Sequence, residues 1–265
     1  YDFIFIDIAD LDLTDFSATT LFLNQTNPEI ILNCAAYTAV DKAEQEPELT
    51  MKLNAALPGL LAAYCAEKKA GLIHISTDYV FDGVHHKPYL EEDPANPQGV
   101  YSRSKRMGEE EILKHPARGI IIRTSWLYSE FGNNFVKTIY NKAKISSQLR
   151  VVCDQVGTPT YAHDLAKTIL DILGTLYTNQ KMEFFHYSNE GVISWYDFAK
   201  AILEIADINT CEVIPIESSD YPTPVKRPFY SVLNKTKIKN RFGITIPYWK
   251  DSLKICMIRM GNGER

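Results

Sequence analysis

The sequence contains no apolar stretch approaching the roughly 18 residues that a membrane-spanning helix requires, and no signal-peptide pattern. Basic residues are in the minority: 28 Lys and Arg stand against 33 Asp and Glu, for a net charge of −5. This balance argues against a nucleic-acid-binding surface, although a local basic pocket for a phosphorylated small molecule is compatible with it. We therefore expect a cytoplasmic protein that acts on small molecules and binds neither membrane nor nucleic acid.

Cysteine is sparse, and the five residues stand far apart along the chain. No pair has the spacing of metal ligands, and the odd number argues against a complete set of disulfides. Buried free thiols in a reducing compartment are the expected state. The adjacent His85 and His86 have no further ligands at suitable spacing, so we predict no metal site.

A glycine-rich turn is also missing near the start, where residues 1–8 predict a β-strand with Asp7 at its end. In a nucleotide-binding βαβ unit, such a carboxylate accepts hydrogen bonds from the adenosine ribose, and the glycine-rich turn precedes it by about 20 residues. We therefore expect a first strand, glycine-rich loop and helix, roughly 25 to 30 residues, to precede Tyr1. Without them a dinucleotide would bind poorly, because no helix N-terminus would face its phosphates.

What is present is typical of a soluble globular protein: 265 residues, of which 45% are hydrophobic and 23% charged. Apolar runs predict strands at residues 29–36, 71–75, 119–124, 151–153, 184–188 and 213–216. Periodic patterns predict helices at about residues 15–25, 48–69, 101–113, 163–173 and 194–206, and a helical tail over residues 234–260 with a turn at Pro247. Pro58 implies a kink or break in the second of these helices.

The most informative stretch follows the strand at residues 71–75, which leads into Ser76 and Thr77. Further on, Tyr101 and Lys105 stand four residues apart, which in a helix places both on one face. A phenol with a pKa of about 10 is a poor acid–base group at neutral pH, but a neighbouring cation lowers that pKa. Thr77, at the carboxyl end of a parallel strand, would supply a second hydrogen bond to the same substrate oxygen.

Residues 76–83, followed by Tyr101 and Lys105, resemble the extended short-chain dehydrogenase/reductase superfamily, and within it the dTDP-4-dehydrorhamnose reductase family. The similarity continues along nearly the whole chain, through residues 33–44, 123–128, 132–135 and 154–160. A Tyr-x-x-x-Lys pattern alone occurs by chance in many helices, so the order and length of these motifs carry the resemblance.

The resemblance implies an α/β fold built on a Rossmann-type doubly wound parallel sheet, with a smaller α/β domain for the substrate. The alternation of strands and helices in the first half agrees with this arrangement. We predict a dinucleotide-binding domain formed by residues 1–125 and roughly 149–177. A nucleotide-sugar-binding domain would then comprise roughly residues 126–148 and 178–265.

The resemblance also implies a reaction: reduction of the C4 ketone of dTDP-4-dehydro-6-deoxy-L-mannose to dTDP-L-rhamnose, for bacterial surface polysaccharide. NADPH or NADH would supply the hydride. Tyr101 would donate a proton to the ketone oxygen. Lys105 would lower the pKa of Tyr101 and bind the nicotinamide ribose, and Thr77 would polarise the ketone.

Family positions that bind the cofactor correspond here to Asp7, Asp12, Leu13, Ala35, Ala36 and Tyr37, together with Tyr101 and Lys105. Asp7 would bind the adenosine ribose, Asp12 and Leu13 the adenine, and the two alanines the phosphates and ribose. Asp7 would repel the 2′-phosphate of NADPH, whereas cations in the residues expected to precede Tyr1 would compensate for it, so the choice between NADH and NADPH stays open. Asn54 is either the Asn common in the superfamily, whose side chain props a strand or a catalytic water, or a polar residue on a helix surface.

Family positions that bind the substrate correspond to Val40, Thr77, Asp78, Trp126, Asn134 and Arg227. Trp126 would stack on the hexose, although by composition alone it would be a core residue. Amides at the helix start near Asn134 suit diphosphate oxygens. The planar guanidinium of Arg227 suits the same group, and an arginine closing a surface helix is the competing interpretation.

Two other functions remain open. A nucleotide-sugar epimerase would share Tyr101 and Lys105 but would return its hydride to the substrate. A reductase-like regulatory subunit, such as the one that accompanies methionine adenosyltransferase, would have much of the same architecture without catalysis. Family members often form homodimers, in some cases through Mg²⁺, but no ligand set for Mg²⁺ can be identified in the sequence.

Overall fold

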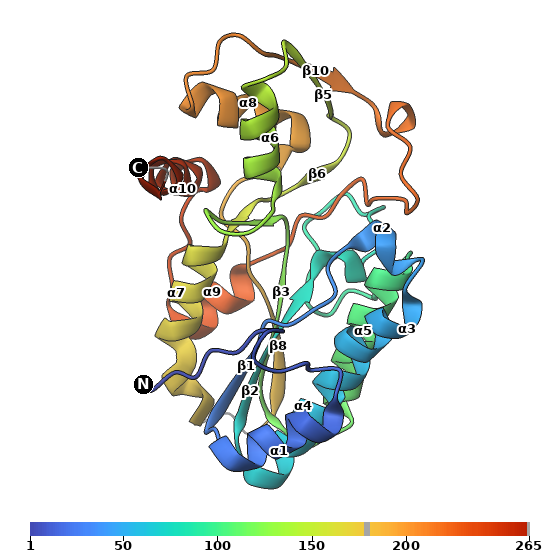
Figure 1. Ribbon diagram of the computed structural model, residues 1–265, viewed down its shortest axis with the longest axis vertical. Helices are drawn as coiled ribbons and strands as arrows, with labels where there is room; N and C mark the ends of the chain where they lie inside the picture. Colours follow the sequence, from blue (N-terminus) through green and yellow to red (C-terminus); the bar gives the residue numbers. More distant parts are fainter. Residues whose placement is uncertain (178–180, 264–265) are drawn as a thin grey trace. The chain divides into compact units, whose positions relative to one another are not determined.

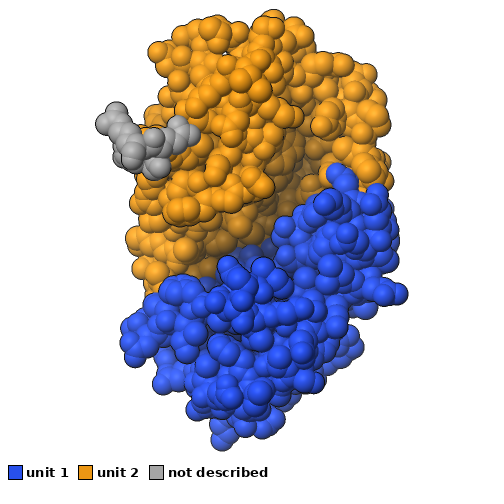
Figure 2. Space-filling model, in the orientation of Figure 1, with its two compact units in different colours: residues 1–76, 97–122, 175–184 blue, residues 77–96, 123–174, 185–265 orange. Residues whose placement is uncertain are grey.

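The computed structural model describes residues 1–177 and 181–263. The chain forms two compact units, which Figure 2 shows in different colours. Unit 1 comprises Tyr1–Ser76, Pro97–Ile122 and Thr175–Phe184, and unit 2 comprises Thr77–Asn96, Arg123–Gly174 and Phe185–Arg265. The predicted cofactor and substrate domains divide the chain at other residues, and that division stays a prediction. Residues 178–180, at the start of the predicted second domain, and residues 264–265 lie outside the described residues.

A sheet with the strand order β1-β2-β3-β8 has most of its residues in unit 1 (Figure 1). Its strands are β1 (Ile30–Asn33), β2 (Gly71–Thr77), β3 (Arg118–Thr124) and β8 (Met182–His186). Strands β1 and β2 run parallel, with Ile30 opposite Gly71 and Asn33 opposite His74. Nearly every residue of β2 and β3 is buried, as their largely apolar sequences predicted. The predicted α/β fold with a parallel sheet is confirmed.

Helices of unit 1 pack beside this sheet. They are α1 (Phe16–Thr26), α2 (Val40–Ala43), α3 (Pro47–Met51), a π-helical turn η1 (Lys52–Ala56), α4 (Leu57–Lys68) and α5 (Val100–Leu113). Leu57 and Leu61 of α4, Leu72 of β2, Ile112 of α5 and Ile121 of β3 share one buried apolar cluster. Burial of this cluster holds α4 and α5 against the middle of the sheet.

The helix predicted for residues 48–69 forms as α3, η1 and α4 in succession. Pro58 has no N–H, so the carbonyl of Asn54 lacks its usual α-helical donor, and the widened turn ends just before the proline. That carbonyl lies close to Gly108 of α5, where an added Cβ would come within 2.1 Å of it. Only glycine permits this approach, so Gly108 allows α5 to pack directly against the backbone of the π-helical turn.

The strand predicted for residues 1–8 is wrong, because this segment has no regular structure and its side chains are exposed. In the doubly wound order the second strand lies beside the first, and no described segment of this chain supplies that neighbour. A strand without a paired edge has no ladder of hydrogen bonds to hold it. Asp7 therefore lies in a turn, where its carboxylate accepts from the N–H of Ala9 at 2.8 Å. Asp15 then caps α1.

Unit 2 consists of helices and short strand pairs. Its elements are η2 (Asp78–Val80), β4 (Leu127–Tyr128), α6 (Phe135–Ala143), β5 (Gln148–Val152), β6 (Val156–Gly157), β7 (Thr160–Tyr161), α7 (Ala162–Ile172), β9 (Ile193–Ser194), α8 (Trp195–Ile205), β10 (Glu212–Ile216), η4 (Ser218–Asp220), α9 (Thr236–Phe242) and α10 (Trp249–Gly263). A short helical turn, η3 (Leu173–Tyr177), follows α7. Strand β5 pairs with β10, β4 with β7, and β6 with β9. Among the described residues, no helix is long and apolar enough to cross a membrane.

An aromatic and aliphatic core joins α6, α8 and α10 within unit 2. Tyr128, Val136, Phe198, Trp249 and Leu253 all belong to one buried cluster. A capping box opens α8: the Ser194 side chain accepts from the N–H of Asp197, and the Asp197 carboxylate accepts from the N–H of Ser194. Because the box satisfies N–H groups of the first turn, these local contacts define where this core helix begins.

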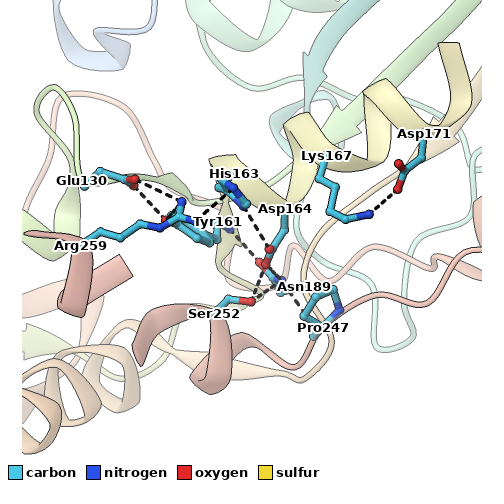
Figure 3. Close-up of polar contacts among 10 residues, drawn as sticks. All are labelled: Glu130, Tyr161, His163, Asp164, Lys167, Asp171, Asn189, Pro247, Ser252 and Arg259. Carbon is cyan, nitrogen blue, oxygen red and sulfur yellow. Dashed lines mark hydrogen bonds and ion pairs between the residues drawn. The ribbon is translucent and has the colours of Figure 1, made fainter. Parts of the chain in front are cut away.

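A buried polar network fastens α10 to α7 and β7 (Figure 3). Asn189, which is fully buried, donates from its amide to the Asp164 carboxylate at 2.8 Å and to the Ser252 hydroxyl at 3.0 Å. Its oxygen accepts from the N–H of Tyr161 at 2.7 Å. One side chain therefore joins α10 to the consecutive elements β7 and α7, with Ser252 and Asp164 88 positions apart in the chain.

Replacing Asn189 with Ala is expected to lower the free energy of unfolding by about 2–4 kcal/mol, because the Tyr161 N–H and the Asp164 carboxylate lose buried partners. Thermal denaturation should show Tm falling by roughly 5 to 15 °C. The matched control is Lys167→Ala, which removes an ion pair to Asp171 between two exposed side chains (Figure 3). That change should cost less than about 1 kcal/mol. Equal falls in Tm for the two substitutions would show that the buried network stabilises the fold no more than an exposed ion pair does.

Candidate functional site

Helix α5 carries the Tyr and Lys of the predicted catalytic motif. The Ser102 hydroxyl accepts from the N–H of Gly99 at 2.8 Å and so closes the first turn of the helix. Tyr101, in this turn, is half-buried, and Lys105 is only 2% exposed. The predicted helix is confirmed, and the spacing of the two residues places their side chains one turn apart on the same side.

Lys105 reaches from α5 to the end of strand β2. Its Nζ atom donates to the backbone oxygen of Ile75 at 2.7 Å and lies 3.4 Å from Nε2 of His74. Burial lowers the pKa of Lys105 to about 8, against the opposing influence of Glu109 and Cys34. A lysine that titrates near neutral pH is suited to proton transfer and occurs most often at functional sites.

A second contact fixes α5 on β2 just beyond Lys105. The Ser76 hydroxyl donates to the buried carboxylate of Glu109 at 2.7 Å, and Arg106 forms a salt bridge with the same carboxylate at 3.0 Å. These contacts hold the helix in register with the end of the strand. The position of Lys105 is thus defined by its helix as well as by its own hydrogen bond.

Asn54 supports the turn that follows β1. This fully buried side chain accepts from the N–H of Tyr37 at 2.8 Å and donates to its carbonyl at 3.0 Å. It also donates to the Ser104 hydroxyl on α5 at 3.0 Å. The interpretation of Asn54 as a polar residue on a helix surface is therefore wrong, and its side chain supports a turn rather than a strand.

The turn after β1 contains the small residues predicted to lie against the cofactor. Ala35 and Ala36 are half-buried, and the N–H of Ala35 donates to the Asn33 side chain at 3.1 Å. The Tyr37 hydroxyl donates to Glu46 at 2.7 Å, and this hydrogen bond raises the pKa of Tyr37. Val40 begins α2 immediately after the turn. Asn33, before the turn, and Glu46 and Asn54, after it, therefore hold the turn in place.

Residues predicted to bind the adenosine lie before α1. The Asp12 carboxylate is exposed and accepts from the N–H of Thr14 at 2.8 Å, which lowers the pKa of Asp12. Leu13 packs against the apolar cluster of unit 1. The roles of Asp7, Asp12 and Leu13 in cofactor binding stay predictions.

Thr77 and Asp78 follow Ser76 at the carboxyl end of β2 and are described with unit 2. The Thr77 hydroxyl donates to the Asp78 carboxylate at 3.1 Å and accepts from the N–H of Tyr79 at 3.2 Å. Burial raises the pKa of Asp78 to about 7, opposed by hydrogen bonds from Ser231 and Thr77. A buried carboxyl group that titrates near neutral pH is a frequent feature of functional sites.

Trp126 adopts a strained backbone conformation, with φ of +47°, which is rare for a bulky side chain. Its ring stacks on Trp195 with centroids 3.6 Å apart, and a Cβ added at Gly157 would come within 2.7 Å of the same ring. Strain of this kind is common at ligand-binding sites, but the ring also packs against the core of unit 2, so the sugar-binding role of Trp126 stays a prediction. Sequence analysis missed Trp195, because nothing local to either tryptophan indicates the stack.

The diphosphate-binding candidates differ in how they are held. Asn134 caps α6, accepting from the N–H of Lys137 at 3.2 Å and donating to the carbonyl of Ser129 at 2.7 Å. Its side chain is therefore engaged, and the N-terminal amides of α6 are the groups suited to an anion. Arg227 is half-buried in an irregular segment. The interpretation of Arg227 as a residue closing a helix is wrong, since no described helix ends there.

Cysteine and metal chemistry contribute little to the candidate site. Cys65, Cys211 and Cys256 are buried thiols, whereas Cys34 is exposed and Cys153 is half-buried. The described parts of the chain hold no group of three or more His, Cys, Asp or Glu side chains placed to bind a metal ion.

Comparison with known proteins identifies close relatives along the whole chain. Residues 1–261 match the family described as RmlD substrate binding domain. A protein of Aggregatibacter actinomycetemcomitans named dTDP-4-dehydrorhamnose reductase is 38% identical over 261 residues, covering 96% of this chain and 89% of the relative.

Two solved structures of enzymes with the same name are similar in sequence and fold. The structure from Clostridium acetobutylicum is 41% identical, with a TM-score of 0.91, and the match covers 97% of this chain and 89% of that one. The structure from Bacillus anthracis, determined in complex with NADP, is 35% identical, with a TM-score of 0.92, and covers 98% and 90%.

Proposed function

The chain belongs to the dTDP-4-dehydrorhamnose reductase family, and we propose that it reduces the C4 ketone of dTDP-4-dehydro-6-deoxy-L-mannose to dTDP-L-rhamnose. The observation that carries this proposal is the pair on α5. Tyr101 and Lys105 stand one helical turn apart, and the Lys105 amine is buried against the end of β2 with its pKa lowered to about 8. Burial of the Lys105 amine costs free energy because the charged group loses its contact with water. A regulatory protein without catalysis would have no need of such a lysine.

Tyr101 is the general acid in this reaction. Bound NADPH or NADH supplies the hydride that forms the new C–H bond at C4 of the sugar. The Tyr101 hydroxyl gives its proton to the ketone oxygen, and Lys105, when charged, stabilises the phenolate that remains. The Thr77 hydroxyl has one proton, which in the structure is directed to Asp78, so polarising the ketone requires this proton to turn to the substrate.

The residues around the ends of β1 and β2 suit a dinucleotide. Both parallel strands end at the same edge of the sheet, where the small Ala35 and Ala36 allow close approach of the backbone and Lys105 offers an amine to a ribose hydroxyl. Tyr37 completes the nicotinamide end. Asp7, Asp12 and Leu13 serve the adenosine end.

The groups that bind the nucleotide sugar come from unit 2 and the start of α2. Trp126 offers an aromatic surface to the hexose, and Asp78 and Val40 contact it beside the ketone. Arg227 and the amides at the start of α6 bind the diphosphate, since a guanidinium and a helix N-terminus both suit phosphate oxygens.

The test is to supply the keto sugar to the purified full-length protein and to follow NADPH and NADH absorbance, with the product identified by mass spectrometry. Stoichiometric loss of reduced cofactor and formation of dTDP-L-rhamnose is the expected result. An epimerase would return its hydride and leave the absorbance unchanged. A regulatory subunit would show no turnover and would co-purify with a synthetase.

We further propose that the enzyme is cytoplasmic and that it forms a homodimer. The absence of a membrane-spanning helix among the described residues and the overall acidic charge are compatible with this location. Light scattering on the purified protein measures the dimer, and a molecular mass equal to that of one chain would exclude it.

A further inference from the structure

A row of buried polar side chains leads from the end of β1 to Lys105, all within unit 1. Asn33 is 4% exposed, and His74 is fully buried in the middle of an apolar strand. The Asn33 amide nitrogen lies 3.0 Å from Nδ1 of His74, and Nε2 of His74 lies 3.4 Å from Nζ of Lys105. Strand pairing places Asn33 directly opposite His74, so the contact is built into the register of the sheet. The proposed reaction assigns no role to either residue.

The backbone determines which way the Asn33 amide faces. The N–H of Ala35 donates to the Asn33 oxygen at 3.1 Å, and a backbone N–H is only a donor. The oxygen therefore lies on the side of Ala35, and the NH₂ group faces the imidazole. Because an NH₂ group only donates, Nδ1 of His74 must accept.

The single proton of the neutral ring is then on Nε2, facing Lys105. Burial, followed by the neighbouring Lys105, holds the pKa of His74 well below its usual range, so the ring is neutral. The Nε2–H group has the lysine nitrogen as its neighbour at 3.4 Å. His74 thus presents a donor to Lys105 and offers it no acceptor.

We propose that His74, held in its Nε2–H tautomer by Asn33, is a positioning residue that favours the neutral amine of Lys105 over its ammonium form. A neutral amine has a lone pair that accepts from Nε2–H, while one of its own protons goes to the carbonyl of Ile75. An ammonium group would have no lone pair and would direct a proton against the ring N–H. This geometry therefore destabilises the ammonium form of Lys105 relative to the neutral amine.

Other charged and titratable groups around Lys105 act in the opposite direction. Glu109 on α5 and Cys34 after β1 both raise the pKa of the amine. The Glu109 carboxylate is already bound by Ser76 and Arg106, which limits its pull on Lys105. The phenol of Tyr101 lies one turn earlier on α5. The lowered pKa of Lys105 shows that burial outweighs these opposing groups, and the donor from His74 acts in the same direction as burial.

The consequence for the reaction rests on the proposed function. After Tyr101 has given its proton to the ketone, it must be protonated again, and a lysine with a pKa near the working pH both takes up and releases a proton readily. Turnover should therefore decline as the pH rises through the pKa of Lys105. His74 and Asn33 would determine where this alkaline limb lies.

The direct test is the tautomer of His74 in the wild-type protein. Long-range ¹H–¹⁵N spectra of protein labelled with ¹⁵N-histidine distinguish Nε2–H from Nδ1–H, and the His74 resonances are identified by their loss in His74→Gln. We expect the Nε2–H form. Observation of the Nδ1–H form would overturn the proposal. This measurement needs no activity, so it remains decisive if the proposed reaction is not found.

The second test uses Asn33→Asp, which keeps the shape of the side chain. One carboxylate oxygen still accepts from Ala35, but the other accepts from His74, so the ring proton moves to Nδ1 and Nε2 offers a lone pair to Lys105. The alkaline limb of the kcat profile should rise by about one pH unit, the usual scale of such a perturbation. An unshifted limb in a variant whose tautomer has switched would refute the role of His74.

The matched control is Cys34→Asp, which brings a carboxylate to a position that already acts on Lys105. It should leave His74 as the Nε2–H tautomer and should move the alkaline limb less than Asn33→Asp does. Equal shifts would mean that added charge, and not the tautomer, explains the result. If Asn33→Asp does not fold, the wild-type tautomer decides the matter.

Discussion

Replacing Tyr101 with Phe is expected to lower kcat by about 10² to 10⁴-fold, the usual contribution of a general acid. The substitution removes the hydroxyl that donates the proton and retains the ring of this half-buried residue. Because the packing of the ring at the start of α5 is preserved, Tm should change little. Steady-state oxidation of NADPH with the keto sugar measures the effect.

A suitable control is Tyr140→Phe, on α6 of unit 2, where the proposed reaction gives the hydroxyl no role. The ring of Tyr140 lies under the amine of Lys144 at 3.8 Å, and this contact does not depend on the hydroxyl. The control should retain nearly full turnover. Tyr101→Phe with turnover close to that of the control would rule out Tyr101 as the acid.

Replacing Lys105 with Met is expected to give the second large loss, about 10²-fold or more in kcat together with weaker cofactor binding. Met has a similar length but no charge to stabilise the Tyr101 phenolate and no amine to bind the ribose. Titration of the variant with NADPH should show a raised Kd. Lys167→Met on α7, where the side chain is 68% exposed, serves as the control.

The same variant should be more stable than wild type, in a pH-dependent way. The pKa of Lys105 is lowered from its ordinary value to about 8 in the folded protein, so the folded state binds fewer protons than the unfolded state above that pH. The destabilisation by the buried ammonium is therefore complete below pH 8 and fades as the pH rises toward about 10.5. The rise in Tm on Lys105→Met should be largest at neutral pH and smallest near pH 10. A fall in Tm at neutral pH would contradict the claim that the buried ammonium of Lys105 destabilises the folded protein.

Much of the framework was predictable because the information lies within a few residues of chain. The apolar runs of β2 and β3, the periodic pattern of α8 and the four-residue spacing of Tyr101 and Lys105 are local patterns, and each formed the expected element. Residues 1–8 show the limit of such patterns. Their composition favours a strand, but a strand forms only where another strand supplies a paired edge.

The sequence by itself determined the family, the fold class and the identity of the Tyr and Lys on α5. Only the tertiary structure decided their electrostatic setting: that Lys105 is buried against Ile75, that Asn54 braces the turn at Tyr37, and that Asn33 orients His74. The last two residues are 41 positions apart, and nothing near either one in the chain indicates the other. Burial and hydrogen-bond partners depend on segments brought together by folding, so the pKa of Lys105 is a property of the packed sheet and helix rather than of the motif.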